Sequence, residues 1–220
     1  MLIDENKKHN FFFSNLSQFK VEDKDGKALG KPGDALFSKD MKIDSLILFG
    51  GLLEEKMEDL GLRENIDPIV PLSAIKSIDE KKRKIVLNVA KKELKTTNAD
   101  YNAPEGLIQY IKLKKIPIFE KNNEKIGRVI DIFFNEKGGY SFIVGGSALE
   151  EFLEKVRIIP DKDLIVPGSS VTEISDKIKI KSAKSELITT LYENITDPQQ
   201  YLGKNKVVFV PKNTSYQILK

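Results

Sequence analysis

The feature that most constrains this chain is an internal repeat, because residues 16–97 and 113–190 carry the same signals in the same order. Four landmarks correspond at offsets of 97, 95, 96 and 93 residues: Gly30–Asp34 with Gly127–Asp131, Ile47–Gly51 with Phe142–Gly146, Ile69–Pro71 with Ile165–Pro167, and Lys92–Thr97 with Ser185–Thr190. Self-similarity at one period is the signature of a duplicated structural unit. The sequence therefore predicts two small domains of one fold, each of roughly 80 residues and large enough to bury a core.

Each repeat has the pattern of several short strands with one short helix. Residues 19–22 alternate apolar and polar side chains, as a half-buried strand does, and Asp25-Gly26 suits a tight turn. The apolar run 43–49 indicates a strand buried on both faces or a sheet closed into a barrel. Apolar residues at helical spacing predict short helices over 52–61 and 147–156. The expected fold class is mainly β, with two tandem small β-barrels, each containing one short inserted α-helix.

The domain boundaries follow from this pattern. Repeat 1 is expected over residues 11–97, a polar linker over 98–109, repeat 2 over 110–190 and a C-terminal extension over 191–220. Apolar stretches at 206–210 and 216–219 flank a proline-containing turn, which predicts that the extension is a β-hairpin.

Composition excludes several functional classes. The 36 basic and 33 acidic residues leave a net charge of +3, whereas a dedicated nucleic-acid binder usually carries a larger excess. Cysteine is absent and His9 is the only histidine, so a thiolate nucleophile, a histidine triad and a zinc site of the usual type are not expected. No apolar run approaches the roughly 18 residues that a membrane helix needs. We expect a soluble cytoplasmic protein, not an enzyme, with no cofactor, no metal and no membrane insertion.

The residues of the first hairpin resemble a known family. Residues 21–34 contain an apolar strand, an Asp-Gly turn and a Gly-Lys-x-x-Asp strand, an order that resembles the opening of the PRC-barrel domain. The later Gly-Gly pair, the Leu-Glu-Glu segment and the Ile-Val-Pro strand look like archaeal members of that family. Repeat 2 departs from the pattern at Lys121–Glu124, which lacks Asp-Gly, and Val129 replaces Pro32 of repeat 1, whose strand is therefore expected to be bent or at an edge.

The resemblance implies a docking module. Roles known in the family are varied and mostly non-enzymatic: a domain of a ribosome maturation factor that docks on a ribosomal protein, the cytoplasmic domain of a photosynthetic reaction-centre subunit, and archaeal cell-division adaptors. The expected function is thus a non-catalytic protein-binding adaptor or scaffold, in archaeal cell division or a similar assembly. The alternative is a ribosome- or RNA-associated maturation factor. The identity of the protein partner and the formation of a homodimer are left open.

Two pairs of equivalent residues could carry chemistry. Asp34 and Asp131 could act as paired acid–base groups, but equivalent residues in separate barrels need not converge. We interpret them as structural carboxylates that accept backbone hydrogen bonds near a strand crossing. Gly50-Gly51 and Gly145-Gly146 could form weak anion sites, although no Walker pattern follows them. The simpler interpretation is that these glycines let the chain leave the sheet.

Three successive aromatic residues open repeat 1. Side chains alternate along a strand, so Phe11, Phe12 and Phe13 cannot all face one core. Phe133 and Phe134 raise the same question in repeat 2. Two interpretations remain open: the five residues form a partner-binding surface, or they pack at the junction of the two repeats.

Basic residues gather on outer strands of both repeats. The candidate anion or RNA contacts are Lys81, Lys82, Arg83, Lys84, Lys177, Lys179 and Lys181. They could contact phosphates, or they could be the solvated faces of strands, where lysine also discourages edge-to-edge pairing. The second interpretation is favoured because the net charge is small and aromatic residues do not interleave with these runs.

Overall fold

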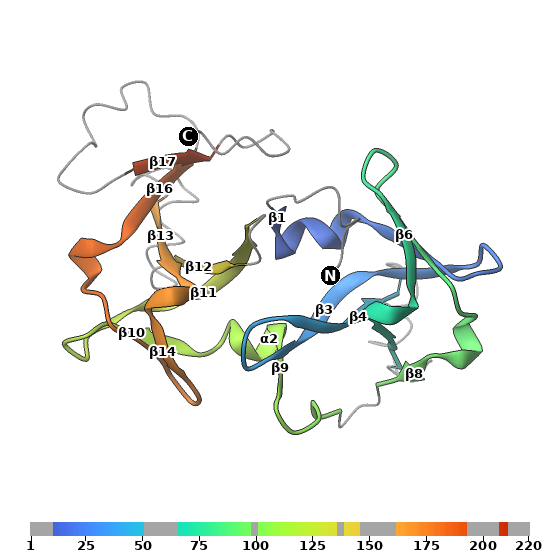
Figure 1. Cartoon of the computed structure of the whole chain (residues 1–220), viewed down its shortest axis with the longest axis horizontal. Coiled ribbons are helices and arrows are strands. Elements are labelled where there is room, and N and C mark those ends of the chain that lie inside the picture. The colour runs from blue at the N-terminus through green and yellow to red at the C-terminus, as the bar shows by residue number, and fades with distance from the viewer. Residues whose placement is uncertain are drawn as a thin grey trace, which may run out of the picture. The chain divides into compact units, whose positions relative to one another are not determined.

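The protein folds into two β-sheets linked by short helical turns (Figure 1). The computed structural model describes residues 11–50, 66–97, 101–135, 139–145, 162–192 and 207–210. The chain divides into two compact units: an N-terminal unit containing Phe13–Leu113, and a C-terminal unit containing Lys114–Lys220 together with the segment that ends at Phe12. The mainly β class predicted from the sequence is confirmed for the described residues.

The N-terminal unit holds an eight-stranded sheet in the order β6-β7-β2-β3-β4-β5-β8, with β9 paired beside β3. Its strands are β2 (Lys20–Glu22), β3 (Ala28–Ser38), β4 (Ile43–Phe49), β5 (Pro68–Pro71), β6 (Ile75–Asp79), β7 (Lys84–Leu87), β8 (Lys95–Thr96) and β9 (Leu107–Gln109). Its helical turns are η1 (Phe13–Gln18), η2 (Leu72–Ala74), η3 (Lys91–Glu93) and α2 (Tyr110–Leu113).

The C-terminal unit holds a nine-stranded sheet in the order β14-β15-β10-β11-β12-β13-β16-β17, with β1 paired beside β11. Its strands are β1 (Phe11–Phe12), β10 (Pro117–Phe119), β11 (Lys125–Phe134), β12 (Tyr140–Gly145), β13 (Lys162–Pro167), β14 (Val171–Ile174), β15 (Ile178–Ile180), β16 (Ile188–Tyr192) and β17 (Val207–Val210). The helical turns are η4 (Gly168–Ser170) and η5 (Lys184–Glu186). Apart from β17, the strand order matches that of the N-terminal sheet, so the duplication extends to topology.

Neither sheet closes into a barrel among the described strands. In the N-terminal unit, the two end strands β6 and β8 do not pair with each other, and β8 is only two residues long. In the C-terminal unit, β17 occupies the outer edge of β16 by parallel pairing, so that edge is not available to β14. The strand expected at 206–210 is confirmed as β17, but it joins β16. His9, Gly51, Gly146, the helices expected over 52–61 and 147–156, and the strand expected at 216–219 lie outside the described residues.

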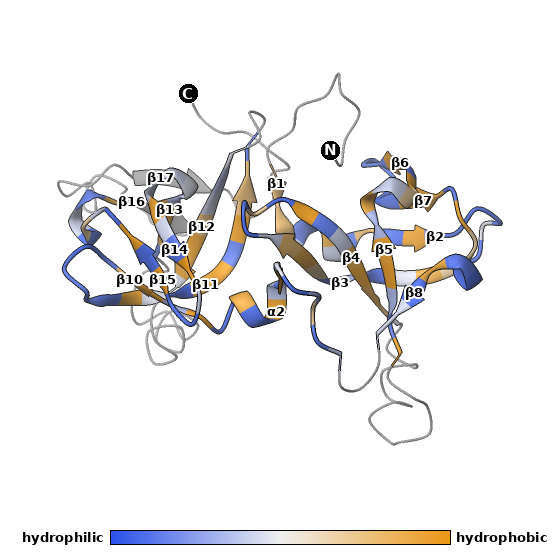
Figure 2. Ribbon diagram, turned by 60° about the horizontal axis from the view of Figure 1, so that its bottom comes forward, coloured by the Kyte–Doolittle hydropathy of each residue, from blue (hydrophilic) through white to orange (hydrophobic). Residues whose placement is uncertain are grey.

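The cores form where consecutive strand residues are all buried. Leu46, Ile47 and Leu48 of β4 expose at most 2% of their surface, and adjacent residues of a strand face opposite sides of the sheet. Both faces of β4 are therefore covered, as the continuous apolar run predicts, and β12 repeats this with Phe142 to Val144. The hydropathy colouring follows this division, with apolar residues concentrated in strands and polar residues in turns (Figure 2). No helix of the described residues combines the length and apolar character needed to cross a membrane.

The long strands β3 and β11 carry a bulge at the same point. The register with the next strand shifts between Pro32 and Asp34 in β3, and between Val129 and Asp131 in β11. Pro32 pairs with Leu48 of β4, while the other edge of β3 pairs with β2 up to Gly30 and with β9 from Leu36 onward. Pro32 thus lies at the bulge, in the stretch of β3 between the residues that pair with β2 and those that pair with β9. This position fits the expectation that its strand is bent or at an edge there, because proline has no N–H to donate.

Candidate docking site

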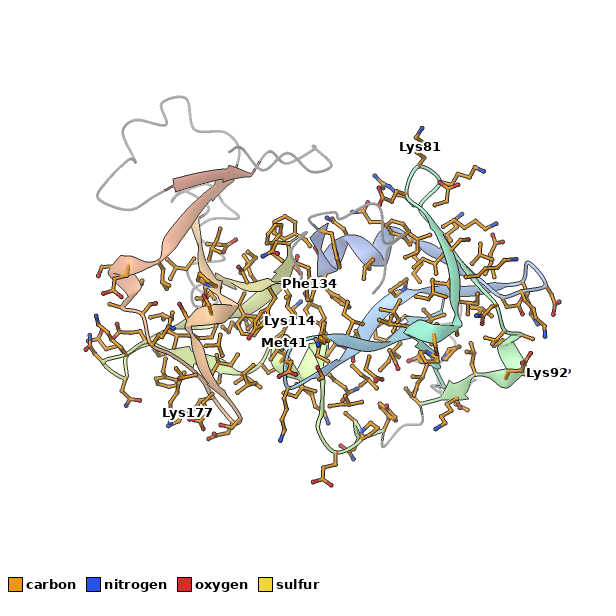
Figure 3. All side chains as sticks on the ribbon, in the orientation of Figure 1. Met41, Lys81, Lys92, Lys114, Phe134 and Lys177 are labelled. Atoms are coloured by element: carbon orange, nitrogen blue, oxygen red, sulfur yellow. The ribbon has the colours of Figure 1, made fainter. Side chains whose placement is uncertain are left out.

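The first strand of the chain pairs with the sheet of repeat 2. Phe11 pairs with Phe134 and Phe12 with Phe133 in an antiparallel ladder between β1 and β11. The ring centroids lie 5.1 Å apart in the first pair and 5.3 Å apart in the second. Phe134 is labelled in Figure 3. Four of the five aromatic residues singled out by the sequence therefore form two ring pairs within the C-terminal unit.

The strand that precedes repeat 2 pairs with the sheet of repeat 1 in the same way. In the ladder between β9 and β3, Leu107 pairs with Ser38, Ile108 with Phe37 and Gln109 with Leu36. Adding 97 to the numbers of the β1 pair Phe11 and Phe12 gives Ile108 and Gln109, and subtracting 97 from Phe134 and Phe133 gives Phe37 and Leu36. The two short strands occupy equivalent positions, but each lies in the sheet of the other repeat. We call β1 and β9 the exchanged strands.

A helical turn follows each exchanged strand and carries matching apolar residues. Phe13 and Tyr110 are equivalent by the same offset, and their rings lie 4.4 Å apart. Both are almost fully buried, with 3% and 6% exposure, and Phe13 also contacts the ring of Phe37 at 5.4 Å. Leu16 and Leu113, three residues further along, are likewise equivalent and buried. Phe13 is thus a core residue of the N-terminal unit.

Asp34 binds the turn that follows β9. Its Oδ1 atom accepts hydrogen bonds from the backbone N–H of Ala35 at 2.8 Å and of Ile111 at 3.0 Å, and Oδ2 accepts one from the side-chain amide of Gln109 at 3.4 Å. The carboxylate therefore caps the first turn of α2 from a neighbouring strand. This confirms the structural interpretation of Asp34, which lies at the bulge. In the equivalent position of β11, Asp131 accepts a hydrogen bond from Ile132 N–H at 2.8 Å.

Burial governs the acidity of Asp34. Asp34 is only 2% exposed, and the loss of solvation on burial raises the pKa of its carboxyl group. The hydrogen bonds from Ile111, Ala35, Tyr110 and Gln109 act in the opposite direction because they stabilise the charged form. No group of histidine or acidic residues arranged to hold a metal ion occurs in the part of the chain that the structure describes.

Two further buried carboxylates bind backbone N–H groups. Asp23 accepts from Asp25 at 3.0 Å, from Lys27 at 2.9 Å and from Lys91 at 3.2 Å. These bonds, that of Lys27 first, lower the pKa of Asp23. Glu120, which is equivalent to Asp23, accepts from Asn122 at 2.8 Å and from Lys184 at 3.3 Å. Each carboxylate joins the turn after the first strand of its repeat to η3 or η5.

The candidate anion-binding residues fall into two groups on different units. Lys81, Lys82 and Arg83 form the turn between β6 and β7, and Lys81 projects from its tip (Figure 3). Lys177, Lys179 and Lys181 lie on or beside β15 of the C-terminal unit. Several of these cations already have partners: Lys82 pairs with Asp79 at 3.6 Å, Lys84 with Glu22, and Lys179 with Glu173 at 2.6 Å, while Lys177 lies 5.9 Å from the ring centroid of Phe119.

The exchange itself is the feature that sequence reasoning missed. The sequence predicts a linker over 98–109 and places Phe11 at the start of repeat 1, yet Leu107–Leu113 lies in the N-terminal unit and Phe12 in the C-terminal unit. A signal is present, because the offset of 97 relates Phe13 to Tyr110 and Leu16 to Leu113. It is weak because strands of two and three residues show no periodicity of their own.

Both units are thus mainly β sheets of one topology, and comparison with known proteins assigns one of them further. Residues 105–187 match the family model of the PRC-barrel domain. The sheet of repeat 1 is not assigned to a family by this comparison, and no curated protein matches the chain. The match begins before β9, so the family's domain includes β9 and α2, which here lie in the N-terminal unit.

Proposed function

We propose that this chain is a non-catalytic adaptor in which two PRC-barrel-like modules, one per repeat, dock a protein partner. Three facts support the extension of the family to repeat 1: the shared strand order, the bulge at the same point, and the equivalent carboxylates Asp23 and Glu120. On this proposal each open sheet is a variant of the family's small barrel. The resemblance of repeat 1 to archaeal members makes a division-type assembly the class of partner to examine first.

The observation that carries the proposal is that the buried carboxylates bind backbone N–H groups of the protein itself. Asp23, Asp34 and Glu120 are each at most 6% exposed, and the hydrogen bonds described above go largely to backbone N–H groups of their own unit. A catalytic acid or base must instead reach a proton on a bound substrate. These carboxylates hold turns and one exchanged strand in place, which is the work of a scaffold.

We place the partner-binding surface away from the phenylalanine pairs. Phe11 and Phe12 are committed to Phe134 and Phe133, so a substitution such as Phe12→Asp would disturb β1 before it reported on a partner. The β6–β7 turn is a better candidate, because Lys81 and Arg83 are exposed and make no ion pair among the described residues. A cationic turn of this kind suits an acidic protein surface.

Capture from native lysate tests this proposal. Tagged full-length protein is incubated with lysate, with and without nuclease, and bound proteins are identified by mass spectrometry. We expect a discrete partner that survives nuclease, is lost with Lys81→Glu, and is retained with Lys92→Glu. Lys92 is a matched control because it is an exposed lysine in η3 of the same unit (Figure 3). Equal capture by both variants would remove the turn as the contact.

The ribosome- or RNA-associated alternative would use the basic residues of both units, those of the β6–β7 turn and those at β15. Phosphate contacts would make binding weaken steeply with salt and disappear with nuclease. Neutralising Lys177, Lys179 and Lys181 should weaken such binding further, whereas an adaptor that recognises a protein through the β6–β7 turn should not respond to these changes.

A further inference from the structure

Each half of the chain lacks one strand of its own module. The family match assigns β9 and α2 to repeat 2, but β9 pairs with β3 of repeat 1 and α2 is hydrogen-bonded to Asp34 of the same strand. Conversely β1, at the start of repeat 1, pairs with β11 of repeat 2. A chain divided between residues 98 and 99 would therefore leave the N-terminal half without β9 and the C-terminal half without β1.

The contacts at the β9 position are those of a specific binding site. Tyr110 and Leu113 are buried in the N-terminal unit, at 6% and 0% exposure, although they follow the predicted linker. Asp34 adds directed hydrogen bonds to Ile111 and Gln109. Three backbone pairs fix the register of β9. Apolar anchors, strand pairing and a cap together describe recognition by β-strand addition.

The contacts at the β1 position are equivalent in register to those at the β9 position. Phe11 and Phe12 make two aromatic contacts to β11. In the equivalent ladder, Ile108 and Gln109 of β9 pair with β3.

Two hydrogen bonds join residues 101–106 to these elements: the N–H of Leu107 donates to the carbonyl oxygen of Pro104 at 3.0 Å, and Lys112 Nζ donates to Asn102 Oδ1 at 3.1 Å. Both lie within the C-terminal half, so a cut between residues 98 and 99 leaves them intact. We call the covalent link at this point the tether.

We propose that the two halves of this chain bind each other through the exchanged strands without the tether, so that a second copy of the chain can supply either half. The partner is a second copy of this chain. A chain must carry both β1 with η1 and β9 with α2 to complete the sheets of both repeats. In the intact chain the tether favours pairing within one molecule by raising the effective concentration of each half. The copies would exchange halves when the sheets open. This inference does not depend on the adaptor function.

Cleavage of the full-length protein tests the proposal. A protease recognition sequence is inserted between Asn98 and Ala99, and the protein is cut after it has folded. We expect both halves to elute together at the mass of the intact chain, 24.9 kDa plus the insertion. An equal mixture of cut unlabelled and cut ¹⁵N-labelled protein is then unfolded and refolded. Native mass spectrometry should show the four combinations of halves in equal amounts.

Two variants make the result specific to the exchanged strands. Phe12→Asp should weaken the association of the cut halves about tenfold or more, because it removes an aromatic pair with Phe133 and places a charge in the ladder. Ile66→Asp is the control, because it places the same charge at an apolar residue of the N-terminal unit that is 39% exposed and lies outside the exchanged strands and the turns that follow them. Halves that separate or precipitate on cutting would overturn the proposal, as would refolding that returns only separate halves. Equal behaviour of the two variants would also overturn it.

Discussion

The two repeats form the same turn with different residues, and this comparison shows what the fold requires. In repeat 1 the turn is Asp23–Lys27, with Gly26 at φ +80°. In repeat 2 it is Glu120–Glu124, with Asn123 at φ +63°. In both, the first residue accepts hydrogen bonds from the turn and from the start of a distant helical turn, η3 or η5. Asparagine is among the few residues that tolerate a positive φ, so the missing Asp-Gly changes the residues and preserves the backbone.

An ion pair next to this turn is also kept in both repeats. Lys24 bonds Glu93 at 2.9 Å, and the equivalent Lys121 bonds Glu186 at 2.9 Å. Each glutamate also accepts a hydrogen bond from the backbone N–H that begins its own helical turn, at Ala90 or Ala183. The ion pair lowers the pKa of each glutamate and raises that of each lysine. The turn and the ion pair beside it are thus conserved together between the two repeats.

The repeats differ in one side-chain contact between neighbouring strands. Lys84 of β7 pairs with Glu22, whereas the equivalent Lys177 lies over the ring of Phe119, which stands in the place of Glu22. Both contacts involve half-buried side chains, and an ion pair and a cation–π contact near the surface are each worth about 1 kcal/mol, so either can replace the other. Backbone requirements are thus shared between repeats, and surface pairs are free to diverge.

The largest expected effect comes from adding a side chain at the strand crossing. Gly30 and Gly127 have φ of +126° and +148°, and a Cβ atom at either would lie 2.1 Å from a backbone oxygen, of Phe49 or Gly145. Gly30→Ala and Gly127→Ala should each lower the free energy of unfolding by about 3 kcal/mol or more, because backbone cannot move aside as a side chain can. Hydrogen exchange read by mass spectrometry should place each loss in its own unit. A mild effect at one glycine only would show that the crossings are not equivalent.

The next effect concerns the cap that holds α2. Asp34→Ala leaves the N–H groups of Ala35 and Ile111 without their acceptor and should cost about 2–3 kcal/mol. Asp34→Asn should cost less, because its amide oxygen can still accept and no charge is buried. Denaturant unfolding compares the two variants, and faster hydrogen exchange should be confined to α2 and β9. Equal losses in the two variants would indicate that the charge, and not the acceptor, matters.

Because the pKa of Asp34 is raised in the folded state, the stability of the protein should depend on pH. The folded state holds the proton of this carboxyl group more tightly than the unfolded state, so the group favours folding at low pH. That contribution is lost as the pH rises from the ordinary aspartate value of 3.8 through the raised folded value. The stability of the wild type relative to Asp34→Asn should therefore fall across this window and stay constant above it. An advantage that rises with pH would contradict the burial argument.

The sequence predicted the features that depend on local chemistry, and it missed those that depend on which strand pairs with which. The turn at Asp25-Gly26, the structural role of Asp34 and the buried run of β4 all follow from residue type and period. The partner of β1 could not be derived, because β3 and β11 offer equivalent edges and a strand of two residues fits either. Likewise the stretch 206–210 predicted a strand, found as β17, but its parallel pairing with β16 depends on a sheet edge that the sequence does not specify.

Exchanging the turn residues should have a smaller effect. Gly26 has a positive φ, and no atom lies within 4 Å of the place that a Cβ atom would take there. Gly26→Ala should therefore cost about 1 kcal/mol from backbone strain alone. Gly26→Asn, which copies Asn123 of repeat 2, should cost only a few tenths of a kcal/mol. Thermal unfolding of the two variants measures the difference. If asparagine is as costly as alanine, the two turns are not interchangeable and the divergence of repeat 2 needs another cause.

The smallest expected effect tests the divergent surface pair. Glu22→Phe gives repeat 1 the residue that repeat 2 carries, and it exchanges the ion pair with Lys84 for a cation–π contact. Stability at low salt should change by no more than about 0.5 kcal/mol, because the two interactions are similar in strength. Denaturant unfolding at low and high salt should show a weaker salt dependence in the variant, since screening acts mainly on the ion pair. The reciprocal change Phe119→Glu should increase the salt dependence of the C-terminal unit. A loss above about 1.5 kcal/mol in either variant would mean that this half-buried position also supports the core, because the ion pair or the cation–π contact alone cannot account for a loss of that size.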